Sequence, residues 1–121
     1  MKLLLGVGGR TESARALERT LSRTRETGDD LTVAVFDDGD AASLDELEAR
    51  VRDALVSRGV DGEVRRVEHD AGSGIVELAE REGFDRIVLG GGERSPMGKV
   101  QVGAVAQYVV VNAPVTVTLV R

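Results

Sequence analysis

Five strand-like segments, four of them apolar and one, residues 63–68, more polar, alternate with four amphipathic ones, and this order restricts the fold more than any other feature of the chain. The apolar segments have the length of buried strands, and the amphipathic ones repeat apolar residues with a helical period. Strict alternation of this kind is typical of a parallel sheet with helices on both faces. The predicted strands span residues 2–7, 31–36, 63–68, 85–90 and 114–121, and the predicted helices 11–26, 43–59, 72–83 and 103–113.

Right-handed crossovers leave few topologies for such a chain, and the flavodoxin-like strand order 3-2-1-4-5 is the commonest for five strands. The length of 121 residues suits one domain with a core of its own. No repeat, linker or low-complexity tract interrupts it. We therefore predict a single-domain α/β fold over residues 1–121. It is a three-layer sandwich around a five-stranded parallel sheet, with the third and fifth strands at its edges.

Local signals place the ends of the helices. We expect Thr11, Ser43 and Asp70 to cap the first three helices at their N-termini, and Gly28 and Gly59 to end the first two. Glu46, three residues after Ser43, completes a capping box. The residues expected to face the core are Ala14, Leu17 and Leu21 in the first helix, and Leu44, Leu47, Val51, Leu55 and Val56 in the second.

Charge and composition exclude several classes of protein. Acidic residues exceed basic ones by 21 to 16 and aromatic residues make up 2%, so non-specific nucleic-acid binding is not expected. There is no cysteine for a disulfide or a thiolate metal site. Without a membrane-length apolar stretch or a signal-peptide pattern, we expect a soluble cytoplasmic protein. The acidic, lysine-poor balance fits a halophilic source, or equally ordinary acidic solubility with a GC-rich genome.

Two glycine-rich loops follow the first and the fourth predicted strand. Gly8 and Gly9 come after the first, and Gly90, Gly91 and Gly92 end or follow the fourth. In the predicted strand order these strands are neighbours at the switch point, where ligands bind beyond their carboxyl ends. Glycine lets backbone N–H groups approach a ligand closely. The pair of loops indicates a binding crevice; alternatively, the glycines only make tight turns.

Two common phosphate-binding templates fail on the second loop, although its dozen residues are more than such loops usually have. In a P-loop alignment Glu93 stands at the first glycine, and Val100 follows Lys99 where a hydroxyl is required. A dinucleotide fingerprint would need a third glycine where Ser95 stands in this loop and Thr11 in the first.

The whole chain resembles the universal stress protein family. The resemblance is carried by the order of elements, by IVELAEREGFDRIVLG before and through the fourth strand, and by GAVAQYVVVNAPVTVTLVR at the end. ATP-binding members carry Gly-x2-Gly-x9-Gly-Ser/Thr across the second loop. Gly90 and Gly103 match its first and last glycines, whereas Glu93 and Ala104 replace the middle glycine and the hydroxyl. Arg94 and Ser95 also agree with the family's loop pattern.

The resemblance implies an adenine nucleotide alpha hydrolase-like fold and a nucleotide site whose motif is only half kept. Where binding members place an aspartate after the first strand, this chain has Gly8. Glu93 adds a carboxylate near the expected phosphates, and Ala104 lacks a donor. Arg10, Arg94 and Lys99 could compensate, or be ordinary surface cations. The implied cofactor-binding residues are Gly8, Gly9, Gly90, Gly91, Gly92, Arg94, Ser95, Gly103 and Ala104.

We therefore expect weak or no ATP binding, with ATP or AMP as the candidate ligands and Mg²⁺ accompanying a triphosphate. The sequence favours a stress-response or regulatory domain, and the alternative is an ATP-binding member with weak hydrolysis. An enzyme is the least favoured reading, because His69 lacks a nucleophile partner and is expected to face solvent. The pairs Asp29-Asp30 and Asp37-Asp38 form no metal cage by spacing and are expected to be solvated.

The last predicted strand favours a homodimer. Val115–Val120 is rich in β-branched residues and uncharged, Pro114 fits the first position of a strand, and Arg121 alone protects the edge poorly. Pairing with the same strand of a second copy about a two-fold axis satisfies the open edge. Family members pair their last strands in this way. The alternative is a monomer whose edge is shielded by the preceding helix.

Overall fold

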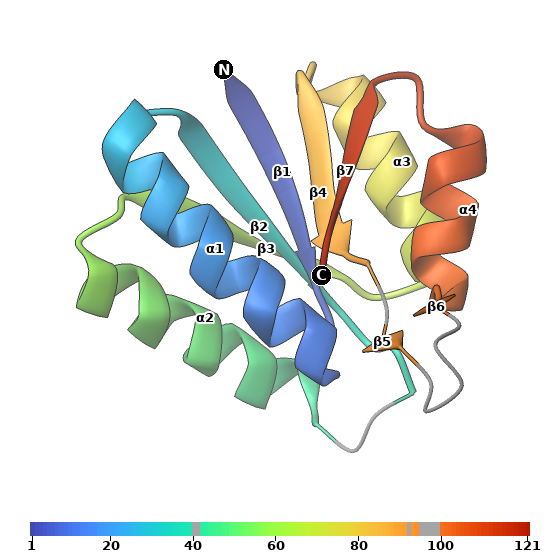
Figure 1. Ribbon diagram of the computed structural model, residues 1–121, viewed down its shortest axis with the longest axis horizontal. Coiled ribbons are helices and arrows are strands. Elements are labelled where there is room, and N and C mark those ends of the chain that lie inside the picture. The colour runs from blue at the N-terminus through green and yellow to red at the C-terminus, as the bar shows by residue number, and fades with distance from the viewer. Residues whose placement is uncertain (40–41, 92, 95–99) are drawn as a thin grey trace.

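A parallel sheet of five strands forms the centre of the protein (Figure 1). The computed structural model describes residues 1–39, 42–91, 93–94 and 100–121. For residues 93, 94, 100 and 101 it describes the backbone alone. The strand order β3-β2-β1-β4-β7 is the predicted 3-2-1-4-5, and every neighbouring pair is parallel. The strands are β1 (Lys2–Val7), β2 (Asp30–Phe36), β3 (Gly62–Val67), β4 (Arg86–Gly90) and β7 (Thr116–Val120).

Helices cover both faces of this sheet, so the predicted three layers are confirmed (Figure 1). On one face lie α1 (Thr11–Thr27) and α2 (Leu44–Arg58), and on the other α3 (Ala71–Arg81) and α4 (Ala104–Asn112). Strand β1 lies at the centre of the sheet and is covered on both faces, which explains why its sequence is a continuous apolar run. Leu3 and Leu5 pack under α1 and α2, whereas Leu4 packs under α3 and α4. No helix in the described ranges is both long and apolar enough to cross a membrane.

Two residues predicted for the core are exposed. In α1, Leu17 and Leu21 are buried as expected, but Ala14 faces solvent, because the face toward the sheet is completed by small and hydroxyl side chains. Those residues are Ser13, Ala16, Thr20 and Thr24. In α2, Leu47, Val51 and Leu55 form the buried row, and Val56 lies about 100° around the helix from Leu55, with 83% of its surface exposed.

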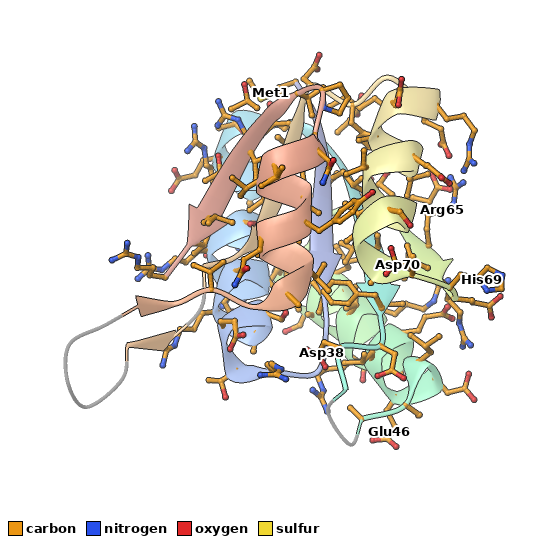
Figure 2. All side chains as sticks on the ribbon, turned by 90° about the vertical axis from the view of Figure 1, so that its right-hand side faces the viewer. Met1, Asp38, Glu46, Arg65, His69 and Asp70 are labelled. Atoms are coloured by element: carbon orange, nitrogen blue, oxygen red, sulfur yellow. The ribbon has the colours of Figure 1, made fainter. Side chains whose placement is uncertain are left out.

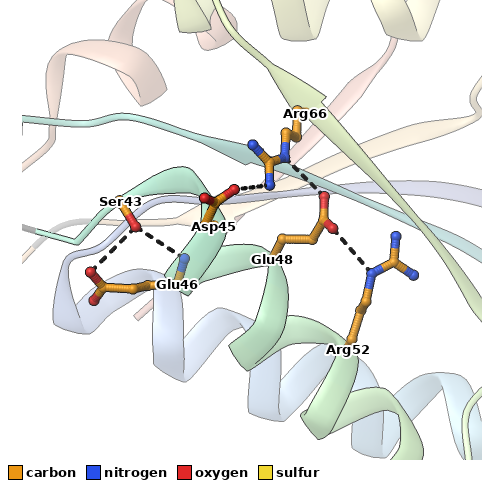
Figure 3. Close-up of polar contacts among 6 residues, drawn as sticks. All are labelled: Ser43, Asp45, Glu46, Glu48, Arg52 and Arg66. Carbon is orange, nitrogen blue, oxygen red and sulfur yellow. Dashed lines mark hydrogen bonds and ion pairs between the residues drawn. The ribbon is translucent and has the colours of Figure 1, made fainter.

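Two of the three predicted N-caps are confirmed. Ser43 Oγ accepts a hydrogen bond from the backbone N–H of Glu46 at 3.1 Å (Figure 3), and Asp70 accepts one from Ser73 at 3.2 Å. The prediction for Thr11 was wrong. It is already helical, and the N-cap is Arg10, which makes no side-chain cap bond because its side chain has no acceptor. Gly28 and Gly59 end α1 and α2 in left-handed conformations, as predicted.

The two edges of the sheet differ in charge. At the β3 edge, Arg65 pairs with Glu82 at 2.6 Å, and Arg66 pairs with Glu48 at 3.0 Å and with Asp45 (Figure 3). The hydrogen bond from Arg66 lowers the pKa of Glu48. These ion pairs keep the edge charged and unsuited to pairing with another sheet. The β7 edge carries no charged residue between Thr116 and Val120.

The segment after β4 contains a second, two-stranded sheet that was not predicted from the sequence. Strand β5 (Glu93–Arg94) pairs antiparallel with β6 (Val100–Gln101). Two-residue strands carry too little periodicity to be recognised in a sequence. Strand β7 also begins later than predicted. Pro114 and Val115 form a bend before it, because α4 runs to Asn112 and the chain must first turn back toward the sheet.

Candidate functional site

A pocket of about 140 Å³ opens beyond the carboxyl ends of β1 and β4. These strands are the neighbours at which the chain reverses its direction across the sheet, so the pocket occupies the predicted switch point. We call it the switch crevice. Its lining residues are Arg10, Glu12, Ser13, Phe36, Asp38, Leu89, Gly90, Gly103, Ala104, Val105 and Ala106.

Gly90 brings the start of α1 against the end of β4. A Cβ built on Gly90 would lie 2.7 Å from the backbone carbon and oxygen of Glu12, closer than real Cβ atoms approach. Its φ is not positive, so Gly90 is not needed here for a left-handed backbone conformation. The requirement is for space instead. Without a side chain at this position, α1 can begin at the wall of the crevice.

The carboxylate of Asp38 fills the space beside Gly8. A Cβ on Gly8 would lie 2.7 Å from Cγ of Asp38, with Oδ2 closer still, and 2.9 Å from the ring of Phe36. The Asp38 side chain is 11% exposed, so the prediction that it is solvated was wrong. The chain thus places a carboxylate next to the end of β1, but supplies it from the loop after β2. In Figure 2 Asp38 lies at the end of the sheet where α1 begins.

Arg10 is held by Asp38 rather than being free for an anion. The backbone N–H of Arg10 donates to Asp38 Oδ2 at 3.2 Å, and its guanidinium Nε lies 3.9 Å from the same oxygen. The backbone N–H of Gly8 donates to Ser13 Oγ at 3.0 Å. These contacts tie the β1–α1 turn to α1 and to the loop after β2. They leave the charge of Glu12 in the crevice with no cation paired to it among the described residues.

The N-terminus of α4 supplies the opposite wall. Gly103 is the N-cap, and no side chain caps the helix in the described part of the chain. The backbone N–H groups of the first turn have no carbonyl partner within the helix and carry a partial positive charge. Ala104, Val105 and Ala106 therefore place hydrogen-bond donors at the pocket. This wall is suited to an anion.

The structure brings together only part of the predicted binding set. Gly90, Gly103 and Ala104 line the crevice, and Gly8 contacts it through Asp38. Gly9 lies in the turn behind it, and Gly91 is buried, with its N–H bonded to the carbonyl of Val120 at 2.6 Å. Gly92, Ser95 and Lys99 fall outside the described residues, as do the side chains of Glu93 and Arg94 in β5.

The groups considered for catalysis lie elsewhere. His69 follows β3 and is exposed, as expected. Together with Asp70 and residues of α3 it lines a separate pocket. Figure 2 labels both residues. Among the described residues, no group of three or more His, Asp or Glu side chains could hold a metal ion.

Comparisons with known proteins agree with this geometry. A family model described as the universal stress protein family matches residues 1–121. The search of curated protein sequences found no significant match. A universal stress protein structure from Archaeoglobus fulgidus has a TM-score of 0.78 and 21% identity, covering 100% of this chain and 98% of its own.

Two further solved structures contain nucleotides. The A. fulgidus universal stress protein in complex with dAMP has a TM-score of 0.71 and 18% identity over 100% of this chain and 98% of its own. A family protein from Arabidopsis thaliana with AMP bound has a TM-score of 0.70 and 18% identity over 99% and 91%. At these identities the likeness establishes the fold. Together with the family match over the full 121 residues, it leads to one assignment: the chain belongs to the universal stress protein family.

Proposed function

We propose that this protein is a small cytoplasmic regulatory domain of the stress response, which acts as a homodimer and binds adenine nucleotides weakly in the switch crevice. The observation that carries the weak binding is the composition of the crevice wall. Glu12 and Asp38 are among its lining residues, and the one cation among the described lining residues is Arg10, whose Nε lies 3.9 Å from Asp38 Oδ2. A triphosphate brings more negative charge to these carboxylates than a monophosphate does, so AMP is the better ligand.

One feature favours the second candidate, an ATP-binding protein with weak hydrolysis. The uncapped N-terminus of α4 offers backbone donors at the crevice, which suits a phosphate group. Solved structures of two family proteins contain dAMP and AMP, which supports a nucleotide as the ligand of this chain. Mg²⁺ would accompany a triphosphate.

Repairing the loop motif should strengthen nucleotide binding. We expect Glu93→Gly with Ala104→Ser to lower the dissociation constant for Mg-ATP about tenfold or more, because a repulsive charge is removed and a hydroxyl donor is added. Calorimetric titration measures the change. Glu93→Gly alone is the control that separates the charge from the hydroxyl. Equal affinities of the double variant and the wild type would contradict this account of the loop.

The homodimer is supported by the open edge of β7. No strand in the described ranges pairs with this edge, and the carbonyl of Val120 is directed toward β4, where it accepts from Gly91. Since peptide groups alternate along a strand, the N–H groups of Val117 and Leu119 are directed to the open side. The adjacent helix α4 has no charged residue, and its Val111 is 80% exposed. A second copy would cover both apolar features.

Proline at Val117 should therefore give monomers. The substitution removes an N–H from the open edge, and the β4–β7 hydrogen bonds stay in place because they use the alternate peptide groups. Val117→Ala keeps the N–H and is the control. Light scattering at micromolar concentration should report a dimer for the wild type and the control, and a monomer for the proline variant. A wild-type monomer would defeat the proposal.

A further inference from the structure

A second, larger hollow lies between α1 and β7, on the face of the sheet that α1 covers. It has a volume of about 620 Å³ and shares no lining residue with the switch crevice. We call it the α1–β7 groove. Apolar side chains of Leu3, Val88 and Val120 belong to its lining, and its volume is typical of small-molecule sites. The other lining residues are Met1, Arg19, Thr20, Arg23, Thr27, Asp29, Arg86, Thr118, Leu119 and Arg121.

Four arginines whose side chains have no ion-pair partner in the described part of the chain line the groove. Eight ion pairs elsewhere in the described part of the chain hold six arginines, among them Arg10, Arg58 and Arg66. None of the ion pairs or side-chain hydrogen bonds in the described part of the chain involves the side chains of the groove arginines. These are Arg19, Arg23, Arg86 and Arg121. In a protein of net charge −5, this is a local excess of positive charge.

The buried Nε–H group of Arg86 is a second observation, besides the surface charge, that indicates a ligand in the groove. Arg86 is half-buried at the start of β4, and its Nε–H is fully buried with no acceptor among the described residues. A buried donor without a partner destabilises a folded protein, so such groups are rare unless an ion or ligand satisfies them. Arg86 lines the groove, so a turn of its guanidinium toward the hollow would let a bound anion accept this hydrogen bond.

The one carboxylate side chain in the groove does not supply that partner. Asp29 accepts from the Thr27 hydroxyl at 2.8 Å and pairs with the amino group of Met1 at 3.2 Å. The Thr27 hydrogen bond and the amino group lower the pKa of Asp29, which stays charged and engaged there. Arg23 acts on it only at longer range. The positive charge of the groove is therefore not neutralised from within.

We propose that the α1–β7 groove is a binding site for an oligophosphate group, either free or at the end of a larger molecule. Guanidinium groups match phosphate oxygens in pairs of parallel hydrogen bonds, and several arginines together hold a chain of phosphates. Arg86 contacts the ligand from the floor, Arg19 and Arg23 from α1. The hydroxyls of Thr20 and Thr118 add donors. The groove uses the face of β4 and β7 on the side of α1, whereas the proposed dimer uses the open edge of β7.

The test is a titration of the full chain with sodium tripolyphosphate at about 0.15 M salt, followed by NMR. We expect saturable shifts at the Arg86 Nε–H and at the amides of Thr118 and Val120. The amides of Ala104 and Ala106 report on the switch crevice and distinguish binding there. Orthophosphate should bind at least about tenfold more weakly, because it can engage fewer of the arginines at once. ATP titrated in the same way tells whether the groove prefers a nucleotide to free oligophosphate.

Substitutions distinguish specific binding in the groove from non-specific electrostatic attraction of the anion to the protein. Arg86→Met, which keeps the volume of the side chain, and Arg19→Gln with Arg23→Gln should each weaken binding about tenfold or more. Arg15→Met removes the same charge from an exposed position of α1 outside the groove and should change nothing. Without ligand, Arg86→Met should melt at the same or a higher temperature, since it removes the unpaired donor. Absence of saturation, equal affinity for orthophosphate, or unaltered binding by both sets of variants would overturn the proposal.

Discussion

Replacing Gly90 by valine lowers the free energy of unfolding by about 1–3 kcal/mol or more, and the melting temperature by about 5–15 °C. The new Cβ would meet the backbone of Glu12 at 2.7 Å, and a backbone cannot turn aside as the end of a flexible side chain can. Either α1 moves away from β4 or β4 bends. Thermal and urea unfolding followed by circular dichroism measures the loss, with no ligand present.

Gly103→Ser is the matched control for this substitution. A Cβ at Gly103 meets no atom of the described residues within 4 Å, its φ of −64° is open to any residue, and serine is a favoured N-cap. We expect its melting temperature to equal or exceed that of the wild type. If Gly90→Val also melted like the wild type, the close approach of α1 to β4 would be wrong.

Restoring the family's aspartate at Gly8 should destabilise the protein by a similar amount, about 1–3 kcal/mol. The side chain would enter the volume that Asp38 and Phe36 already fill, and would place two carboxylates side by side. Gly8→Asp with Asp38→Ala should recover most of the loss, because the space and one charge are both released. A double-mutant cycle gives the coupling, which we expect to be about 0.5–3 kcal/mol.

The neighbouring aspartate provides the control for that rescue. Asp37 is exposed and accepts a hydrogen bond from Gly39 at 2.9 Å, so Gly8→Asp with Asp37→Ala removes the same charge without freeing the space. It should stay as unstable as Gly8→Asp alone or be less stable. If both double variants recovered equally, charge alone would account for the effect, and the exchange of position between Gly8 and Asp38 would be wrong.

The sequence sufficed for the parts of the fold that local patterns determine. The apolar run of β1, the cap at Ser43 and the left-handed glycines after α1 and α2 each depend on residues close together in the chain. The strand order followed from the alternation of strands and helices, because handedness leaves few arrangements. The switch crevice followed from the order in turn.

The rest required three-dimensional contacts. Asp38 looked like a solvated loop residue, since nothing near it in the chain indicates that its carboxylate covers the end of β1. The need for a glycine at position 90 could not be derived from the sequence, because its neighbour in space, Glu12, is 78 positions away in the chain. The signal that was present is Gly8 itself: a missing side chain at a ligand-facing position leaves room that a side chain from a neighbouring loop can fill.

We propose that the switch crevice keeps the place and the donors of a nucleotide site but carries too much negative charge for tight ATP binding. Calorimetric titration of the wild-type protein with Mg-ATP, with AMP as the companion ligand, tests it most directly. We predict a dissociation constant for Mg-ATP weaker than about 1 μM, or no detectable binding, and tighter binding of AMP. A sub-micromolar dissociation constant for Mg-ATP would contradict the claim.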